Sequence, residues 1–457
     1  NQIADITFAR QYAKDSRPYG SSSWNRNLSF VLAGGYNFDN RYLLDFSARE
    51  DASSLYGNDN RWALGWSLAL GWNLHNEKFF KNDIVQQFKL RASIGVTGNQ
   101  NFYNNEAVAT YEYYTTDNYL GMTGAQVARM ANPQLKGEQK KDYNVGFDAI
   151  IYKANIRFDY YWADTKNMLT DVSVSTSTGF STVKDNLGLV RNQGIEAYLT
   201  YSVFQTNKGF LQLFGSLTTT TNKIIRLSES MKTYNALRDK MAADKGNNKP
   251  VTKYVDGESM NTIWAVRSLG IDPQTGNEVY VKRNGELTYT YDENDQVPAG
   301  NSLEKYRGTF GFNAEYKGFG LSTTFRYATG YQKYNSTLVE RVENVDMNYN
   351  VDKRALYGRW KEPGQVAQFK RLGTFQYDGD AQAYQEKTRP TTRFVQDESL
   401  LTWGALNVYY EFQPDVLKSL RMSRLKISFN MNDIATFSSV KVERGYSYPF
   451  ARTMSFS

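Results

Sequence analysis

Apolar and polar residues alternate along several stretches of the chain. In one stretch the apolar positions are Phe88, Leu90, Ala92, Ile94 and Val96, and the polar positions are Lys89, Arg91, Ser93 and Thr97. A period of two predicts an extended strand with one apolar face and one polar face. The same alternation returns in residues 143–151, 195–203, 310–316 and 425–431. Strands of about 9–11 residues with this pattern are typical of a transmembrane β-barrel, which is apolar outside and polar inside.

The connections between these stretches are alternately short and long. Tight turns are predicted at 38–40, 153–154, 207–209 and 317–318, and moderate turns at 75–86 and 411–421. Longer loops are predicted at 52–60, 98–139, 167–190, 223–303, 334–397 and 434–446. Since such barrels keep short turns on one side, the long loops should share one end, outside the cell. We expect an all-β, antiparallel barrel with 14 strands, beginning near residues 3, 27, 40, 61, 86, 140, 155, 191, 209, 304, 319, 398, 422 and 447.

The amino-acid composition suits a membrane barrel and argues against thiol chemistry and nucleic-acid binding. The 34 Tyr, 26 Phe and 8 Trp suit aromatic girdles at the two membrane interfaces. The chain has no Cys, which excludes disulfides and thiolate chemistry. A net charge of +7 from 54 basic and 47 acidic residues is a mild bias, and no nucleic-acid partner is expected.

The sequence shows no convincing arrangement of residues for catalysis or for metal binding. The single histidine, His75, falls in a predicted short turn with no nearby pocket signal for a Ser–His arrangement. The acids Asp292, Glu293 and Asp295 lie in a polar loop and fit no complete calcium-loop pattern. We therefore expect no enzyme, no catalytic residue, no metal site and no cofactor.

Aromatic and basic residues of the long loops are candidates for contacting a solute or a protein partner. They are Tyr111, Tyr113, Tyr114, Tyr119, Trp264, Arg267 and Trp360. Their rings could stack on sugars, grip a peptide or contact another protein. Two alternatives stay open: Tyr111 and Tyr113 could extend a strand to the aromatic girdle, and Trp264 and Arg267 could pack a long loop onto itself.

A second group of candidates alternates with the apolar strand positions and is predicted to face the lumen. It comprises Lys89, Arg91, Asp148, Arg157, Asp159, Glu196 and Arg326. Charges inside a barrel can bind a plug or shape the passage of a solute. Packing against a plug is the simpler interpretation.

Short motifs follow one another in a recognisable order along nearly the whole chain. They include Arg41–Leu44, Arg49–Ser54, Gly95–Gln100, Asn132–Lys136, Asn192–Glu196, Gly270–Gly276, Arg359–Gly364 and Phe394–Leu400. With these motifs the chain resembles the C-terminal part of SusC/RagA-like TonB-linked outer-membrane proteins of Bacteroidetes-type bacteria. It departs from the family pattern at 403–407, 430–434 and 442–445, as a divergent branch would.

The resemblance implies a 22-stranded barrel with an N-terminal plug. Residues 1–457 would then be the C-terminal portion of one barrel domain, with the plug and the first strands upstream. It also implies an outer-membrane importer of oligosaccharides or oligopeptides, energised through a TonB-type protein and capped by a SusD-like lipoprotein. Outer-membrane lipid and lipopolysaccharide would surround it. The alternatives are a non-transporting structural or assembly subunit of a larger complex and, with less support, an adhesin or passive porin.

Overall fold

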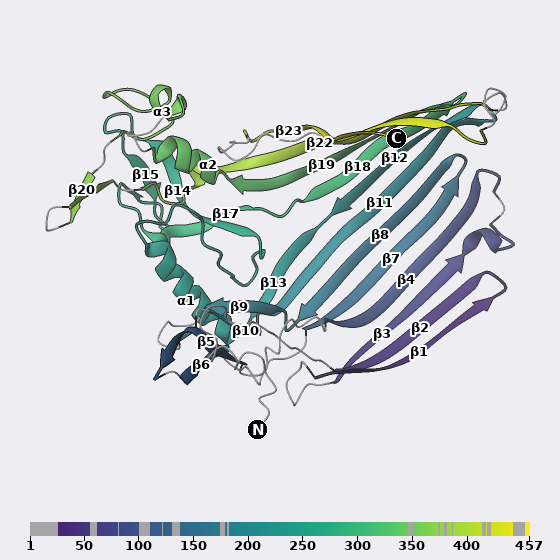
Figure 1. Ribbon diagram of the computed structural model, residues 1–457, viewed down its shortest axis with the longest axis horizontal. Coiled ribbons are helices and arrows are strands. Elements are labelled where there is room, and N and C mark those ends of the chain that lie inside the picture. Colours follow the sequence, from purple (N-terminus) through teal and green to yellow (C-terminus); the bar gives the residue numbers. More distant parts are fainter. Residues whose placement is uncertain are drawn as a thin grey trace.

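The structure is a computed structural model with one large antiparallel sheet and a layer of ordered loops at one end (Figure 1). It describes residues 26–54, 62–80, 82–99, 110–120, 122–129, 138–173, 179–180, 182–345, 351–372, 375–378, 382–385, 387–413, 417, 422–441 and 453–457. The sheet runs in the order β1 (Asn27–Phe38), β2 (Tyr42–Ser53), β3 (Trp62–Asn73), β4 (Val85–Asn99), β7 (Glu138–Ile151), β8 (Ala154–Lys166), β11 (Gly188–Thr206), β12 (Gly209–Thr219), β18 (Tyr306–Tyr316), β19 (Phe319–Tyr334), β22 (Val395–Glu411), β23 (Lys426–Ser438) and β24 (Met454–Phe456). We call this sheet the wall.

The wall confirms the predicted antiparallel barrel strands. Every predicted strand has a counterpart except the first, near residue 3, which lies outside the described residues. A strand that the sequence assigned to a loop, β13 (Thr221–Leu227), also joins the wall by pairing with β11. It follows β12 after one residue, Thr220, and both keep the same initial register against β11. The described strands form an open sheet with β1 and β24 at its edges, as a part of a barrel would.

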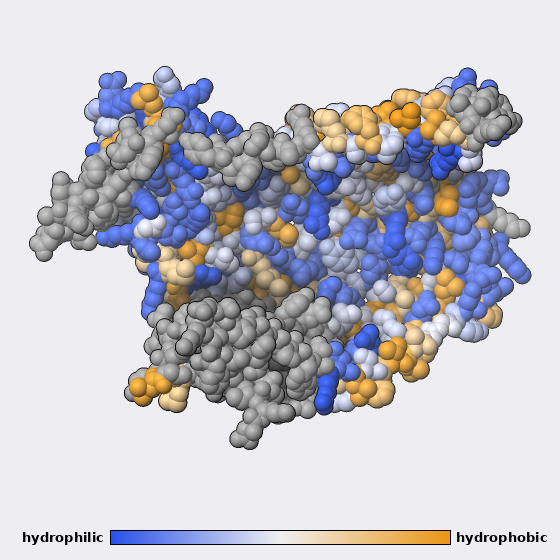
Figure 2. Space-filling model, in the orientation of Figure 1, coloured by the Kyte–Doolittle hydropathy of each residue, from blue (hydrophilic) through white to orange (hydrophobic). Residues whose placement is uncertain are grey.

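The two faces of the wall differ in chemistry, as the alternation predicts. Neighbouring strands align Leu90 with Phe147 and Phe147 with Phe158 on one face, and Arg91, Gly146 and Asp159 on the other. The apolar face is exposed at many large side chains, including Phe30, Leu32, Trp62, Leu64 and Leu70. Figure 2 shows hydrophilic residues across the middle of the face in view and hydrophobic ones along its margins. So wide an apolar surface is typical of the lipid-facing side of a transmembrane β-barrel.

Aromatic pairs mark both borders of the apolar face. On β3, Trp72 stacks with Tyr42 at 6.3 Å near the short turns, and Trp62 stacks with Phe30 at 6.3 Å near the long loops. Trp62 and Trp72 are about 33 Å apart along the strand at about 3.3 Å per residue. A strand tilt of about 40° reduces this to a height of about 25 Å, the height of the apolar band of outer-membrane barrels.

The described parts of the predicted long loops 98–139, 167–190, 223–303 and 334–397 lie at one end of the wall (Figure 1). Of the other two predicted loops, residues 55–60 and 442–446 lie outside the described residues, and residues 434–438 belong to β23 instead of a loop. The location of the long loops outside the cell stays a prediction. They contain more regular structure than the sequence indicated: the hairpins β5 (Thr110–Tyr119)–β6 (Met122–Arg129) and β9 (Leu169–Ser173)–β10 (Thr182–Asn186), the helix α1 (Glu229–Ala243), the sheet of β14 (Thr262–Ile271), β15 (Glu278–Val281), β16 (Leu287–Thr288) and β17 (Gln296–Asn301), the short helices η5 (Glu293–Asp295), α2 (Ser336–Leu338), η6 (Val339–Glu343), α3 (Arg354–Tyr357) and η7 (Thr392–Phe394), and the hairpin β20 (Phe375–Asp378)–β21 (Gln382–Gln385). We call this end the loop layer.

The buried apolar residues gather in the loop layer. One cluster joins Met231 and Tyr234 of α1 to Val190 of β11 and Ile224 of β13. A second cluster surrounds Phe369 and Phe394 and holds the segments that follow β19. No helix in the described part of the chain is long and apolar enough to cross a membrane.

Candidate functional site

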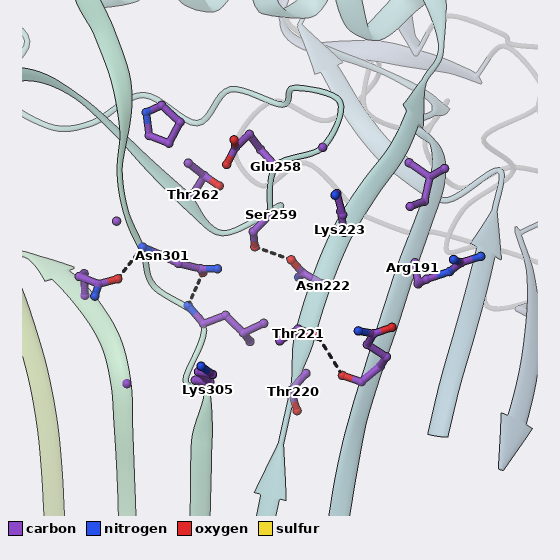
Figure 3. A pocket seen from close by; sticks show the side chains of 18 residues that line it. Arg191, Thr220, Thr221, Asn222, Lys223, Glu258, Ser259, Thr262, Asn301 and Lys305 are labelled. Carbon is purple, nitrogen blue, oxygen red and sulfur yellow. Dashed lines mark hydrogen bonds between the residues drawn. The ribbon is translucent and has the colours of Figure 1, made fainter. Parts of the chain in front are cut away.

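A polar cleft of about 850 Å³ lies where β13 separates from β18 (Figure 3). One side is formed by β11 and β13, and the other by β17, the approach to β18 and the end of β19. Residues 257–262 close it near the loop layer. The separation begins at Thr220, whose amide donates a 3.3 Å hydrogen bond to the carbonyl of Lys305. The cleft therefore forms at the point where the wall becomes the loop layer.

Amide side chains hold the two sides of the cleft in place. The Oδ1 of Asn222 accepts hydrogen bonds from the Ser259 hydroxyl and from the Met260 amide, the latter at 3.2 Å. The Oδ1 of Asn301 accepts from the Leu303 amide at 2.9 Å. Because these carbonyl oxygens are occupied, each amide group offers mainly N–H donors to a ligand.

The charges of the cleft are mostly positive. Lys223 and Lys305 lie on opposite sides, and among the described residues neither forms a salt bridge. Arg191 is held by Asp164 through two bonds of 2.7 and 2.8 Å, and Glu258 is the one acid of the lining. The described lining contains neither aromatic nor histidine side chains. The cleft can therefore bind a polar, acceptor-rich ligand.

A charge network occupies the polar face of the wall and joins four of the predicted lumen residues. Arg91 donates to Asp148 at 2.8 and 3.1 Å and to Asp159 at 2.9 and 3.1 Å. Arg157 donates to Asp159 at 3.1 Å. Arg91 reaches Asp159 across β7 at Gly146, where an added Cβ would clash with Asp159 Oδ1. The glycine is therefore required for this contact between β4 and β8.

The other predicted lumen residues lie on the same polar face of the wall, outside this charge network. Lys89 is directly opposite Asp148, and Glu196 is opposite Asp159. Arg326 lies far along the wall and binds Asp433 at 2.7 Å. Their role in the passage of a solute stays a prediction.

The loop candidates have mixed environments. Trp264 is 4% exposed and donates from Nε1 to the Lys253 carbonyl at 2.8 Å. Arg267 donates to the Lys282 carbonyl at 2.9 Å, and Trp360 donates to the Pro273 carbonyl at 2.8 Å. The contacts of Trp264 and Arg267 are the ones expected of residues that pack a loop onto itself, whereas the contact of Trp360 joins the 334–397 loop to the 223–303 loop.

Among the tyrosines, Tyr111 is 69% exposed on β5 and is available to a partner. The side chains of Tyr113, Tyr114 and Tyr119 lie outside the described part of the structure.

A buried ion cluster in the loop layer was missed by the sequence analysis. Arg393 binds Glu278 at 2.9 Å and Glu343 at 2.6 Å, and the two carboxylates are 1% and 0% exposed. Burial alone would raise the pKa of Glu278, but the charge of Arg393 and hydrogen bonds from Arg393, Ser268 and Thr391 hold it below its ordinary value. The cluster joins β15, which begins at Glu278, to η6, which ends at Glu343, and to η7, which contains Arg393. No local pattern could have revealed it, because its members lie far apart in the sequence.

The acids considered for metal binding act as turn residues. Asp292 Oδ1 accepts from the amide of Asn294 at 2.9 Å, and Asp295 Oδ1 accepts from the amide of Arg283 at 2.9 Å. Within the described residues no group of three or more His, Cys, Asp or Glu side chains could hold a metal ion. His75 lies in η3 (Leu74–Asn76), with Nδ1 3.3 Å from the amide of Phe88.

Comparisons with known proteins agree on one family. A sequence profile described as TonB-dependent receptor-like β-barrel matches residues 5–250, more than half of the chain. A TonB-dependent receptor of Formosa agariphila is 21% identical over 92% of this chain and 43% of its own length. The TonB-dependent receptor SusC of Bacteroides thetaiotaomicron is 29% identical over 66% of this chain and 31% of its own length. The chain spans less than half the length of these relatives.

A solved structure shares the fold. The structure described as the RagAB peptide transporter superposes with a TM-score of 0.75 at 21% identity, covering 91% of this chain and 44% of that chain.

Proposed function

The chain belongs to the TonB-dependent receptor-like β-barrel family, and we propose that it forms part of an outer-membrane active importer of the SusC/RagA-like kind. The resemblance found in its sequence motifs is confirmed by these relatives. The wall carries the proposal, because its outer face has the height of a membrane and its inner face is polar and charged. In the proposed mechanism, solute binds at the loop layer and crosses through the lumen when a plug moves under force from a TonB-type protein. This chain contributes binding and gating and no covalent step.

Oligosaccharides or oligopeptides are the proposed substrates. The donors of the cleft, among them Lys305 and the amides of Asn222 and Asn301, suit the many oxygen acceptors that both polymers carry. The lining of the cleft does not favour oligosaccharides over oligopeptides. Its described residues include no aromatic rings for stacking on sugars and few apolar residues for contacting peptide side chains.

A SusD-like surface lipoprotein is the proposed partner at the loop layer. Ordering a loop costs about 1–2 kcal/mol per residue, and here the apolar clusters and the ion cluster of Arg393 offset part of this cost. The ordered surface still exposes apolar side chains at Leu269, Leu287, Tyr289 and Val366. Exposed apolar groups on an ordered platform favour contact with another protein.

Uptake by cells tests the function. The full-length protein would be supplied to a strain that lacks it, and accumulation of labelled oligosaccharides and oligopeptides would be measured with the TonB-type protein present or deleted. We expect accumulation that requires both proteins. If cells accumulate no solute while the protein still assembles with its partners, the structural or assembly role replaces transport; if uptake is independent of the TonB-type protein, the passive-pore alternative is favoured.

A further inference from the structure

One face of the small sheet in the loop layer contains an apolar hollow of about 340 Å³. The sheet consists of β16, β15, β14 and β17, in this order (Figure 1). Alternation along β15 places Glu278 on one face, where it binds Arg393, and Val279 on the other. The hollow lies on the Val279 face, and its lining includes Leu269 and Leu287, which are 67% and 60% exposed. It therefore offers the apolar contacts that are few in the polar cleft.

A glycine keeps part of the hollow open. Gly270 lies opposite Val279 in the sheet and belongs to the lining. Its φ is +102°, a conformation that glycine adopts readily and other residues do not, and an added Cβ would meet no atom within 4 Å. The backbone conformation at this position therefore excludes a side chain from space that a ligand can fill.

A carboxylate without a cation lines the hollow at the end of β14. Asp272 accepts hydrogen bonds from the amide of Gln274 at 2.9 Å and from the hydroxyls of Thr275 and Tyr289 at 2.7 and 2.8 Å. These neutral donors hold the pKa of Asp272 below its ordinary value, so the carboxyl group is ionised. Among the described residues Asp272 forms no salt bridge.

The complement of an unpaired carboxylate beside apolar side chains is a cation on an aliphatic stem. Lysine and arginine side chains have this form, because both carry their charge at the end of a methylene chain. The ring of Tyr289, which is 56% exposed and lines the hollow, adds an aromatic face for the cation. The chemistry of the lining therefore selects a basic side chain.

Backbone groups of β16 lie beside the hollow, and β16 is the edge strand of the described sheet. The amide of Lys282 donates to the carbonyl of Glu286 at 2.9 Å, and the next pair along the two strands is Val281 and Leu287. Because hydrogen-bonded and non-hydrogen-bonded pairs alternate in an antiparallel ladder, the N–H and C=O groups of Leu287 point away from β15. An extended peptide that pairs with Leu287 places the side chain of its opposite residue on the face of the hollow.

We propose that this hollow binds a lysine or arginine side chain of an extended oligopeptide, whose backbone pairs with Leu287 and whose cation pairs with Asp272. The inference rests on the proposed function and selects peptides as its substrate class, because neutral sugars carry no cation. The size of the site favours a peptide over a protein partner. Nine residues line the hollow, whereas a stable protein interface takes about 20–30 residues a side.

Peptide titration of the full-length protein in detergent tests the proposal. The fluorescein-labelled peptide Thr-Val-Lys-Val-Thr would be compared, by fluorescence anisotropy, with the same peptide carrying norleucine in place of lysine, which keeps the stem and removes the charge. We expect the lysine peptide to bind about 10-fold more tightly, because norleucine loses a hydrogen bond between charged groups. N-methylation of the central lysine removes the donor to the Leu287 carbonyl and should weaken binding about 5-fold.

Two matched variants separate the charge of Asp272 from its role in the turn. Asp272→Asn keeps an acceptor oxygen for the amide of Gln274 and removes the charge, so it should bind both peptides with equal, low affinity. The control is Asp292→Asn, because Asp292 also accepts from the amide two residues later, that of Asn294, at 2.9 Å but lies outside the hollow. Asp292→Asn should keep the full preference for lysine.

Equal affinity of the unchanged protein for the lysine and norleucine peptides would overturn the proposal. A preference retained in Asp272→Asn, or lost equally in Asp292→Asn, would do the same. If neither peptide binds and a complex with the SusD-like lipoprotein slows hydrogen exchange at residues 269–272 and 287–289, a protein partner is the occupant instead.

The titration requires no transport, so its outcome is separate from that of the uptake experiment. Absence of uptake with the lysine preference intact would remove the import function and leave the binding site. Uptake without any lysine preference would remove the site and leave the import function.

Discussion

Replacing Arg393 with Met should loosen the loop layer without unfolding the wall. Arg393 is the shared cation of two buried carboxylates, those of Glu278 and Glu343. Removing one partner of a buried pair costs about 3–5 kcal/mol, because the charges that remain are unpaired in a medium of low dielectric. Protonation of a carboxyl limits the cost, so we expect the lower part of this range. A loss of about 3 kcal/mol raises the population of the opened loop layer more than 100-fold.

Hydrogen exchange measures this change segment by segment. Amides of residues 262–301 and 339–345 should exchange more than 100-fold faster in Arg393→Met, while those of β4, β7 and β8 keep their protection. Lys282→Met is the matched control, because Lys282 pairs with Glu286 in the same layer at 3.0 Å but both side chains are well exposed. Its exchange should not change measurably. Unchanged exchange in Arg393→Met, or equal loss of protection in the wall, would refute the structural role of the cluster.

Three further variants or conditions test the wall and the loop layer. Ile94→Arg places a charge on the apolar face and should destabilise the barrel in lipid by about 2–4 kcal/mol, measured by denaturant unfolding in vesicles; no effect would show that the two faces are exchanged. Gly146→Ala should cost about 1–3 kcal/mol in the same assay, because its Cβ would meet Asp159, whereas Gly215→Ala has open space, with its nearest neighbour atom at 3.9 Å, and should cost little. The loop layer should lose stability below about pH 4.5, because Glu278 has a lowered pKa in the folded state and must be protonated as the pH falls through that pKa; protease resistance of the loops that is the same at pH 7 and pH 3 would contradict this.

The wall could be predicted because its strands have one lipid-facing side and one polar side, and this difference appears in the sequence as alternating apolar and polar residues. Leu90 and Arg91 are neighbours in the chain, yet one lies on the lipid face and the other on the polar face. The sheet of the loop layer lacks this alternation of apolar and polar residues. In β14 four consecutive residues, Ile263 to Val266, are all buried, so no period of two is visible.

The candidate sites were predictable only in part. Alternation placed Arg91 and Asp159 on one face, but their contact depends on strand pairing and on the glycine between them. Lys223 and Lys305 line opposite sides of one cleft because the wall divides at Thr220, and this division leaves no periodic signal in the sequence.

The continuity of β12 and β13 has a mechanical consequence. Both strands share one hydrogen-bonded ladder with β11, and the chain enters α1 directly after this ladder ends. A pull on α1 along the strand direction therefore loads the ladder in shear, so its hydrogen bonds resist the force together, whereas a hairpin turn would let them open one at a time. The wall and this part of the loop layer should consequently move as one rigid body when a force is applied. A hinge is therefore expected only in segments that do not pair with β11.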